Sequence, residues 1–147
     1  MSGIVVGVDG SPHSQKALDW ALAESTLRHA PLTVLAVSPV AASAWTHASL
    51  HYGGDEDVRA QVEQATREIV DKAVTHSDPA YGQQVTVQVV SGVAADELIK
   101  ASEDADLVVV GARGAGGFTK LMMGSVSSQV THHALCPVVV VPGDHTR

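Results

Sequence analysis

The sequence predicts an α/β fold in which a doubly wound, five-stranded parallel sheet has helices on both faces. Three observations predict it. Five short apolar runs alternate with helical stretches along the chain, as in repeated strand–helix–strand units. Most of these runs contain few polar residues, which is typical of strands buried on both faces. The length of 147 residues and the hydrophobic content of 45% fit one domain covering residues 1–147.

The first two strands and the helix between them follow from local patterns. Ile4–Val8 is apolar throughout. Ser11 and Pro12 then predict a helix start, because a serine hydroxyl caps a helix and a proline fits its first turn. The helix extends to about His29. Its buried side should carry Leu18, Ala21, Leu22 and Ser25, extended by Trp20 and Leu27. Pro31–Val37 is the second strand.

A connector over residues 39–57 separates the second strand from a strongly periodic helix. Its length suggests a lid or a mobile loop, and a solvated variable loop is the alternative. The helix begins near residue 58, and its buried face should carry Val58, Val62, Ala65, Ile69 and Ala73. Val85–Val89 alternates apolar and polar residues. This third strand should therefore be half exposed and lie at an edge of the sheet.

The remaining elements complete the alternation. Gly92 opens a short helix, and Asp106–Val110 forms the fourth strand. Ser125–Ala134 is the last predicted helix, with the Ser125 hydroxyl placed where an N-cap is wanted. Cys136–Pro142 is the fifth strand, followed by a polar tail.

Charge and composition exclude several classes of partner. The net charge of −7 argues against non-specific nucleic-acid binding and against an acidic membrane surface. The single cysteine, Cys136, excludes an internal disulfide. No apolar run reaches the length of a membrane span, and the first residues carry no basic signal region. We therefore expect a cytoplasmic protein.

A glycine-rich stretch follows the fourth strand and predicts a phosphate cradle. Gly111, Gly114 and Gly124 lack a Cβ, so that backbone N–H groups can approach an anion closely. Ser125 adds a hydroxyl where a helix begins, and helix starts favour phosphate. Because the carboxyl ends of parallel strands share one edge of a sheet, Asp9 should lie near this stretch. A crossover loop without a ligand is the alternative.

The spacing Gly-x2-Gly-x9-Gly-Ser, from Gly111 to Ser125, resembles the ATP-binding signature of the universal stress protein family. Other segments resemble the same family: the first-strand motif Val8-Asp9-Gly10-Ser11, the third-helix motif Gly92-Val93-Ala94 with Leu98-Ile99, and the ending Gly124–Ser127 with Cys136–Val140. The resemblance covers Ile4–Val141 and implies the strand order 3-2-1-4-5.

The resemblance implies an ATP site, with Mg²⁺ as the expected companion of the nucleotide. Adenine would lie against Val8, Asp9 and Val37, with Asp9 as the polar contact. Ribose and phosphates would lie over the segment formed by Val110, Gly111, Arg113, Gly114, Gly124, Ser125, Val126 and Ser127. Apolar walls suit adenine, and N–H and O–H donors suit phosphates. Asp9 has a second interpretation, an Asx-turn ahead of the helix, and it can do both.

The leading hypothesis is a nucleotide-dependent stress-response sensor or regulator. It is at most a slow ATPase, because no nucleophile–base pair or water-activating residue is evident. No residue is assigned a catalytic or metal-binding role. Cyclic AMP is the alternative ligand, and a nucleotide-free dimeric interaction module is the alternative function. The implied strand order puts Val138–Val141 at a sheet edge, which predicts a homodimer through this strand.

Overall fold

The structure is a computed structural model that describes residues 3–39, 54–76, 84–112 and 124–143. Its five strands form one parallel sheet in the order β3-β2-β1-β4-β5, which confirms the predicted fold class and strand order. The strands are β1 (Ile4–Val8), β2 (Leu32–Pro39), β3 (Val85–Gly92), β4 (Leu107–Gly111) and β5 (Val138–Val141). The prediction that β3 is a half-exposed edge strand is also confirmed.

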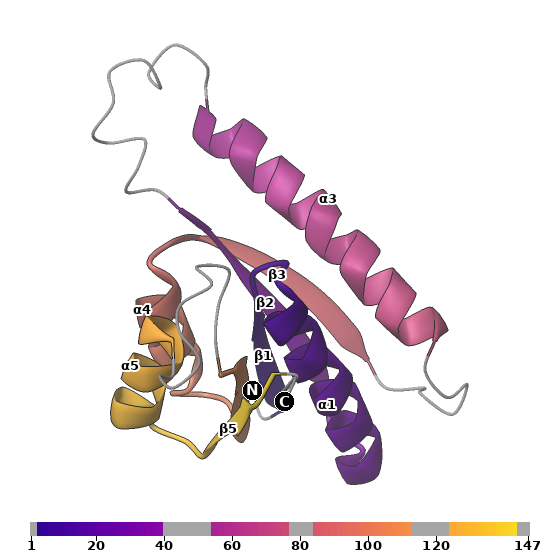
Figure 1. Ribbon diagram of the computed structural model, residues 1–147, viewed down its shortest axis with the longest axis vertical. Helices are drawn as coiled ribbons and strands as arrows, with labels where there is room; N and C mark the ends of the chain where they lie inside the picture. The colour runs from indigo at the N-terminus through magenta and orange to yellow at the C-terminus, as the bar shows by residue number, and fades with distance from the viewer. Residues whose placement is uncertain (1–2, 40–53, 77–83, 113–123, 144–147) are drawn as a thin grey trace.

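Helices cover both faces of the sheet. The described helices are α1 (Pro12–Arg28), α3 (Gly54–Thr75), α4 (Ala94–Ala101) and α5 (Ser125–His133). Figure 1 shows α1 and α3 on one face and α4 and α5 on the other. Each face has its own apolar core, one built around Val6 and Leu18 and the other around Val108 and Leu98. The chain winds from β1 to β3 over the first face and returns to β4 over the second, which makes the sheet doubly wound.

Several element ends differ from the predicted ones. β2 and β3 stay paired from Leu32↔Val85 to Pro39↔Gly92, so both strands continue past the predicted ends at residues 37 and 89. Gly92 therefore closes β3, and α4 begins at Ala94 after Val93 as its N-cap. The prediction that Gly92 opens this helix was wrong. Helix α3 begins at Gly54, ahead of the predicted start near residue 58.

The buried face of α1 follows the prediction with one correction, whereas the predicted face of α3 is only partly buried. The predicted inward residues of α1, Leu18, Ala21, Leu22 and Ser25, are all buried. Leu27 was predicted to extend this face but is 76% exposed. In α3, Val58 and Ala65 are exposed, whereas Thr66 and Val70 are buried. The prediction missed Thr66 because a polar side chain counts against burial, but its hydroxyl donates to the Val62 carbonyl at 2.7 Å.

The outer edge of β3 carries a side-chain contact from α3. The Leu32 N–H donates to the Gln84 carbonyl at 2.9 Å, so the alternation of a parallel ladder turns the Val89 carbonyl away from β2. The Arg59 guanidinium donates to this outward carbonyl at 2.8 Å. One acceptor of an otherwise open strand edge is therefore already used within the chain.

Candidate functional site

The carboxyl ends of β1 and β4 separate where the chain reverses direction across the sheet. These strands pair only from Ile4↔Leu107 to Val6↔Val109. Both strands continue, to Val8 and Gly111, but no further pair joins them in the part of the chain that the structure describes. From this point α1 leaves over one face and α5 over the other. A doubly wound sheet binds ligands at such a switch point, and we call this gap the β1–β4 crevice.

The turn after β1 places Asp9 at the rim of this crevice. Gly10 has φ of +83°, a left-handed conformation that glycine adopts without strain. The Ser11 N–H donates to Asp9 Oδ1 at 2.9 Å, and the Ser11 hydroxyl accepts from the Ser14 N–H at 3.2 Å as the N-cap of α1. The Asx-turn interpretation of Asp9 is thus confirmed. Its side chain is exposed, and contact with adenine stays a prediction.

Helix α5 starts on the other side of the crevice. Its N-cap is Gly124, not Ser125 as predicted, and Ser125 is the first helical residue. The Gly124 N–H donates to the Ala112 carbonyl at 2.7 Å, which ties together the two described ends of the connection between β4 and α5. Because glycine has no side chain to cap the helix, no hydroxyl or carboxylate of the N-cap occupies the N–H groups of the first turn.

The charge near the start of α5 favours an anion. No acidic residue lies in the first turn of α5, whereas the first turn of α4 carries Asp96 and Glu97. The helix dipole adds partial positive charge at this end. The first internal bond of α5 runs from the Ser128 N–H to the Gly124 carbonyl, at 3.0 Å. The N–H groups of residues 125–127 precede it and have no acceptor within the helix.

The side chains of the Gly-Ser-Val-Ser segment point to different surroundings. Ser125 is exposed, and Val126 packs against the core beneath α4 and α5. Ser127 is only 2% exposed, and its hydroxyl lies 3.1 Å from the Ala112 carbonyl and 3.0 Å from the Gly124 carbonyl. The Ser127 hydroxyl therefore links the end of β4 to the start of α5. Contact between Ser127 and a phosphate stays a prediction, and its backbone N–H is the group that would make it.

The remaining predicted site residues differ in burial. Val8 and Val110 are buried, each in a different core, so they would meet a ligand mainly through their backbone. Val37 is partly exposed and precedes the end of β2. Gly111 ends β4 opposite Val141. Arg113 and Gly114 lie outside the described residues, so their place in the site stays a prediction.

Ionisable side chains elsewhere form no metal centre within the described ranges, where no group of three or more His, Cys, Asp and Glu residues could hold an ion. His132 and His133 are exposed, and the Nδ1 of His132 lies 2.7 Å from the Ser128 carbonyl.

Burial raises the pKa of the Cys136 thiol. A backbone hydrogen bond with Val108 lowers this pKa by a smaller amount, and the negative charge of Asp106 raises it slightly further. This cysteine is therefore a poor nucleophile at neutral pH.

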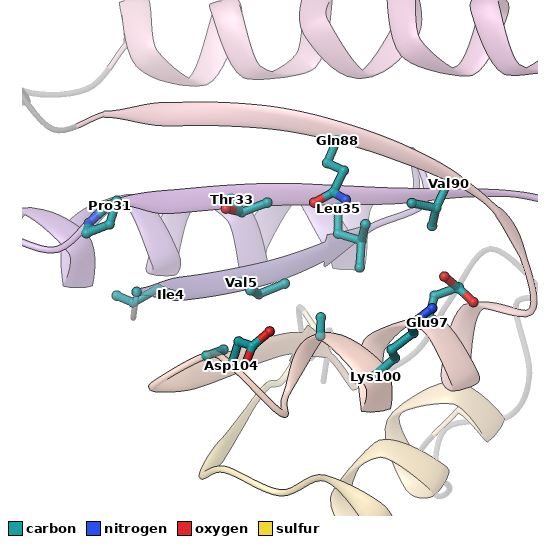
Figure 2. Close-up of a pocket in the computed structure, with 13 residues that line it drawn as sticks. Ile4, Val5, Pro31, Thr33, Leu35, Gln88, Val90, Glu97, Lys100 and Asp104 are labelled. Atoms are coloured by element: carbon teal, nitrogen blue, oxygen red, sulfur yellow. The ribbon is translucent and has the colours of Figure 1, made fainter. Parts of the chain in front are cut away.

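A separate hollow of about 300 Å³ lies between α4 and the sheet face formed by β1, β2 and β3. Figure 2 shows Thr33 and Gln88 on its sheet side and Lys100 on α4. None of its lining residues belongs to the predicted nucleotide site, and Gln88, Lys100 and Asp104 are exposed to solvent. We assign no ligand to it.

The model of the universal stress protein family matches residues 1–142 of this chain. A universal stress protein of Mycolicibacterium smegmatis is 38% identical over 148 aligned residues, covering 97% of this chain and 48% of that protein. The chain thus spans about half the length of the curated relatives it matches.

Among the described residues, no helix is both long enough and apolar enough to cross a membrane.

Solved structures share this fold. The universal stress protein UspA from Lactobacillus plantarum has a TM-score of 0.78 at 27% identity, covering 95% of this chain and 97% of that one. A universal stress protein in complex with cAMP has a TM-score of 0.68 at 24% identity, covering 98% of both chains. One from Archaeoglobus fulgidus in complex with dAMP has a TM-score of 0.58 at 18% identity, covering 95% of this chain and 97% of that one.

Proposed function

The chain belongs to the universal stress protein family, and we propose that it is a nucleotide-dependent regulator that binds ATP in the β1–β4 crevice. Adenine would lie near Val8, Asp9 and Val37. The phosphates would extend across Gly111 toward the first turn of α5. Mg²⁺ would accompany the phosphates, and no protein side chain is assigned to it. The binding of ATP would favour one conformation that a partner recognises.

One observation carries this proposal. The N-terminus of α5 has a glycine N-cap, no acid in its first turn, and a position beside the gap between β1 and β4. By contrast, α1 starts at the same end of the sheet but is capped by Ser11. These features support the proposal, because a helix end of this kind suits a phosphate on one side of the crevice and the polar side chain of Asp9 suits a base on the other.

A cyclic nucleotide is the second candidate ligand. Two solved structures of the same fold are complexes with cAMP and dAMP, which favours an adenine nucleotide in general. The glycine spacing from Gly111 to Ser125 in the sequence favours a longer phosphate chain, and therefore ATP. Any hydrolysis should be slow, because the sequence contains no evident nucleophile–base pair or water-activating residue. We also propose a cytoplasmic location and a homodimer through β5.

Millimolar ATP with Mg²⁺ is expected to raise the melting temperature of the protein. Ligand at about a hundred times its dissociation constant stabilises a fold by roughly 2.7 kcal/mol, which corresponds to roughly 5–10 °C for a chain of this size. Differential scanning fluorimetry with ATP, cyclic AMP and GTP would rank the ligands. Inorganic triphosphate serves as the control for a non-specific anion effect. A melting curve that ATP does not move would contradict the proposal.

A further inference from the structure

We propose that Arg59 blocks the outer edge of β3 and thereby prevents a second copy of this chain from pairing with that strand. Helix α3 packs over β2 and β3 (Figure 1). From this helix the Arg59 guanidinium donates to the Val89 carbonyl of β3 at 2.8 Å. The inference concerns the edge opposite to β5, and it depends neither on nucleotide binding nor on a dimer through β5.

Strand β3 is the longer of the two edge strands. It has eight residues, Val85–Gly92, whereas β5 has four. It pairs with β2 along this whole length, which keeps its backbone extended. Within the part of the chain that the structure describes, no strand pairs with its outer side. A long edge of this kind favours pairing with another chain unless it is protected.

The side chains of β3 do not protect its edge. They stand above and below the sheet, whereas an incoming strand approaches in the plane of the sheet. The alternation of the parallel ladder turns the N–H and C=O groups of Val85, Val87, Val89 and Ser91 outward into that plane. Protection there must come from another element, and α3 supplies one such group in Arg59.

The Arg59 guanidinium occupies a position that a neighbouring strand would need. Because the Val89 carbonyl points out of the sheet, a donor at 2.8 Å lies where the N–H of a further strand would lie. That strand would have to displace a charge-assisted hydrogen bond and leave the guanidinium without its acceptor beside the new ladder. In an isologous contact through β3, both copies would also bring the same positive charge to the interface.

Arg67 provides a matched control on the same helix. Its guanidinium bonds to Glu63 at 3.0 Å, within α3. Arg59→Ala and Arg67→Ala each remove one exposed positive charge from α3, and alanine suits a helix. Only Arg59→Ala frees the Val89 carbonyl, so the pair of variants separates the blocking contact from the loss of charge.

The test measures the mass of the full chain by sedimentation velocity at increasing concentration, with circular dichroism to show that each variant folds. Arg59→Ala should shift toward species of about twice the wild-type mass as concentration rises, whereas Arg67→Ala should keep the wild-type mass. Hydrogen exchange should show that the amides of residues 85–92 become more protected in the associated Arg59→Ala protein. Arg59→Gln, which has a shorter and uncharged side chain, replaces Arg59→Ala if that variant does not fold.

Three outcomes would overturn the blocking role of Arg59. The first is a folded Arg59→Ala protein that keeps the wild-type mass at every concentration. The second is equal association of Arg67→Ala, which would attribute the effect to charge alone. The third is association of Arg59→Ala without added protection of β3. Each variant is compared with the wild type, so the test is valid whether the wild type is a monomer or a dimer through β5.

Discussion

Gly114→Val is expected to abolish ATP binding while leaving the fold largely intact. A β-branched side chain at the second glycine of the Gly-x2-Gly-x9-Gly-Ser pattern would block the approach of backbone N–H groups to phosphate. The described ends of this connection are tied by the bond between Gly124 and Ala112. A substitution between them should therefore have little effect on the sheet.

Gly117→Val is the matched control for this prediction. It introduces the same side chain into the same connection, at a glycine that the pattern does not require. We expect Gly114→Val to lose the whole ATP-induced stabilisation, about 2.7 kcal/mol at a hundredfold excess over the dissociation constant, and Gly117→Val to keep most of it. A folded Gly114→Val protein with wild-type affinity would show that the cradle interpretation is wrong.

Substitutions in β5 are expected to convert a dimer into a folded monomer. The Val108 N–H bonds to the Pro137 carbonyl and the Ala112 N–H to the Val141 carbonyl. The alternation of a parallel ladder therefore turns the N–H and C=O groups of Val138 and Val140 outward. No strand of the described residues pairs with this edge. Two copies meeting antiparallel would satisfy these groups in an isologous contact.

The two edges of the sheet differ in a way that favours β5. At β3, Arg59 already occupies an outward carbonyl, and exposed polar side chains alternate along the strand. At β5, four partly exposed valines follow one another without a charge. An apolar edge of this kind favours pairing with another strand unless it is covered.

Val140→Pro and Val139→Lys test this interface in different ways. Proline at Val140 removes an outward N–H, which a monomer tolerates at an edge strand. The Val140 side chain also packs against the core beneath α4 and α5, so circular dichroism must show that this variant folds. Lysine at Val139 adds charge to the apolar strand, but Val139 also packs against the core beneath α1, so circular dichroism must show that this variant folds. Sedimentation at micromolar concentration should give a wild-type dimer and monomeric variants. A monomeric wild type, or variants that remain dimeric, would refute this interface.

The sheet could be predicted from the sequence because most of its strands are short apolar runs that alternate with helical stretches. At Thr66 and at the ends of β2 and β3, hydrogen bonds that the sequence pattern does not reveal decided the outcome. Thr66 is buried because Val62 accepts from its hydroxyl. β2 and β3 continue to Pro39 and Gly92 because their last residues pair with each other. The local sequence of neither strand indicates this longer pairing.

The sequence predicts a location for the candidate site, and that location stays a prediction. The glycine spacing and the carboxyl end of β1 indicate the edge of the sheet at which β1 and β4 separate. The sequence did not reveal that Gly124 is the N-cap of α5, or that the Ser127 hydroxyl faces inward to the Ala112 carbonyl. Both depend on how the chain returns from β4, which local sequence does not determine.

Mass spectrometry of the nucleotide released from freshly purified protein tests the central claim most directly. The protein should be purified without added nucleotide, denatured, and its supernatant analysed for ATP, cyclic AMP and other nucleotides. We predict that ATP is recovered from the wild type and is lost from Gly114→Val. Recovery of cyclic AMP alone would support the second candidate ligand. Wild-type protein that releases no nucleotide and does not bind ATP in titration would contradict the account.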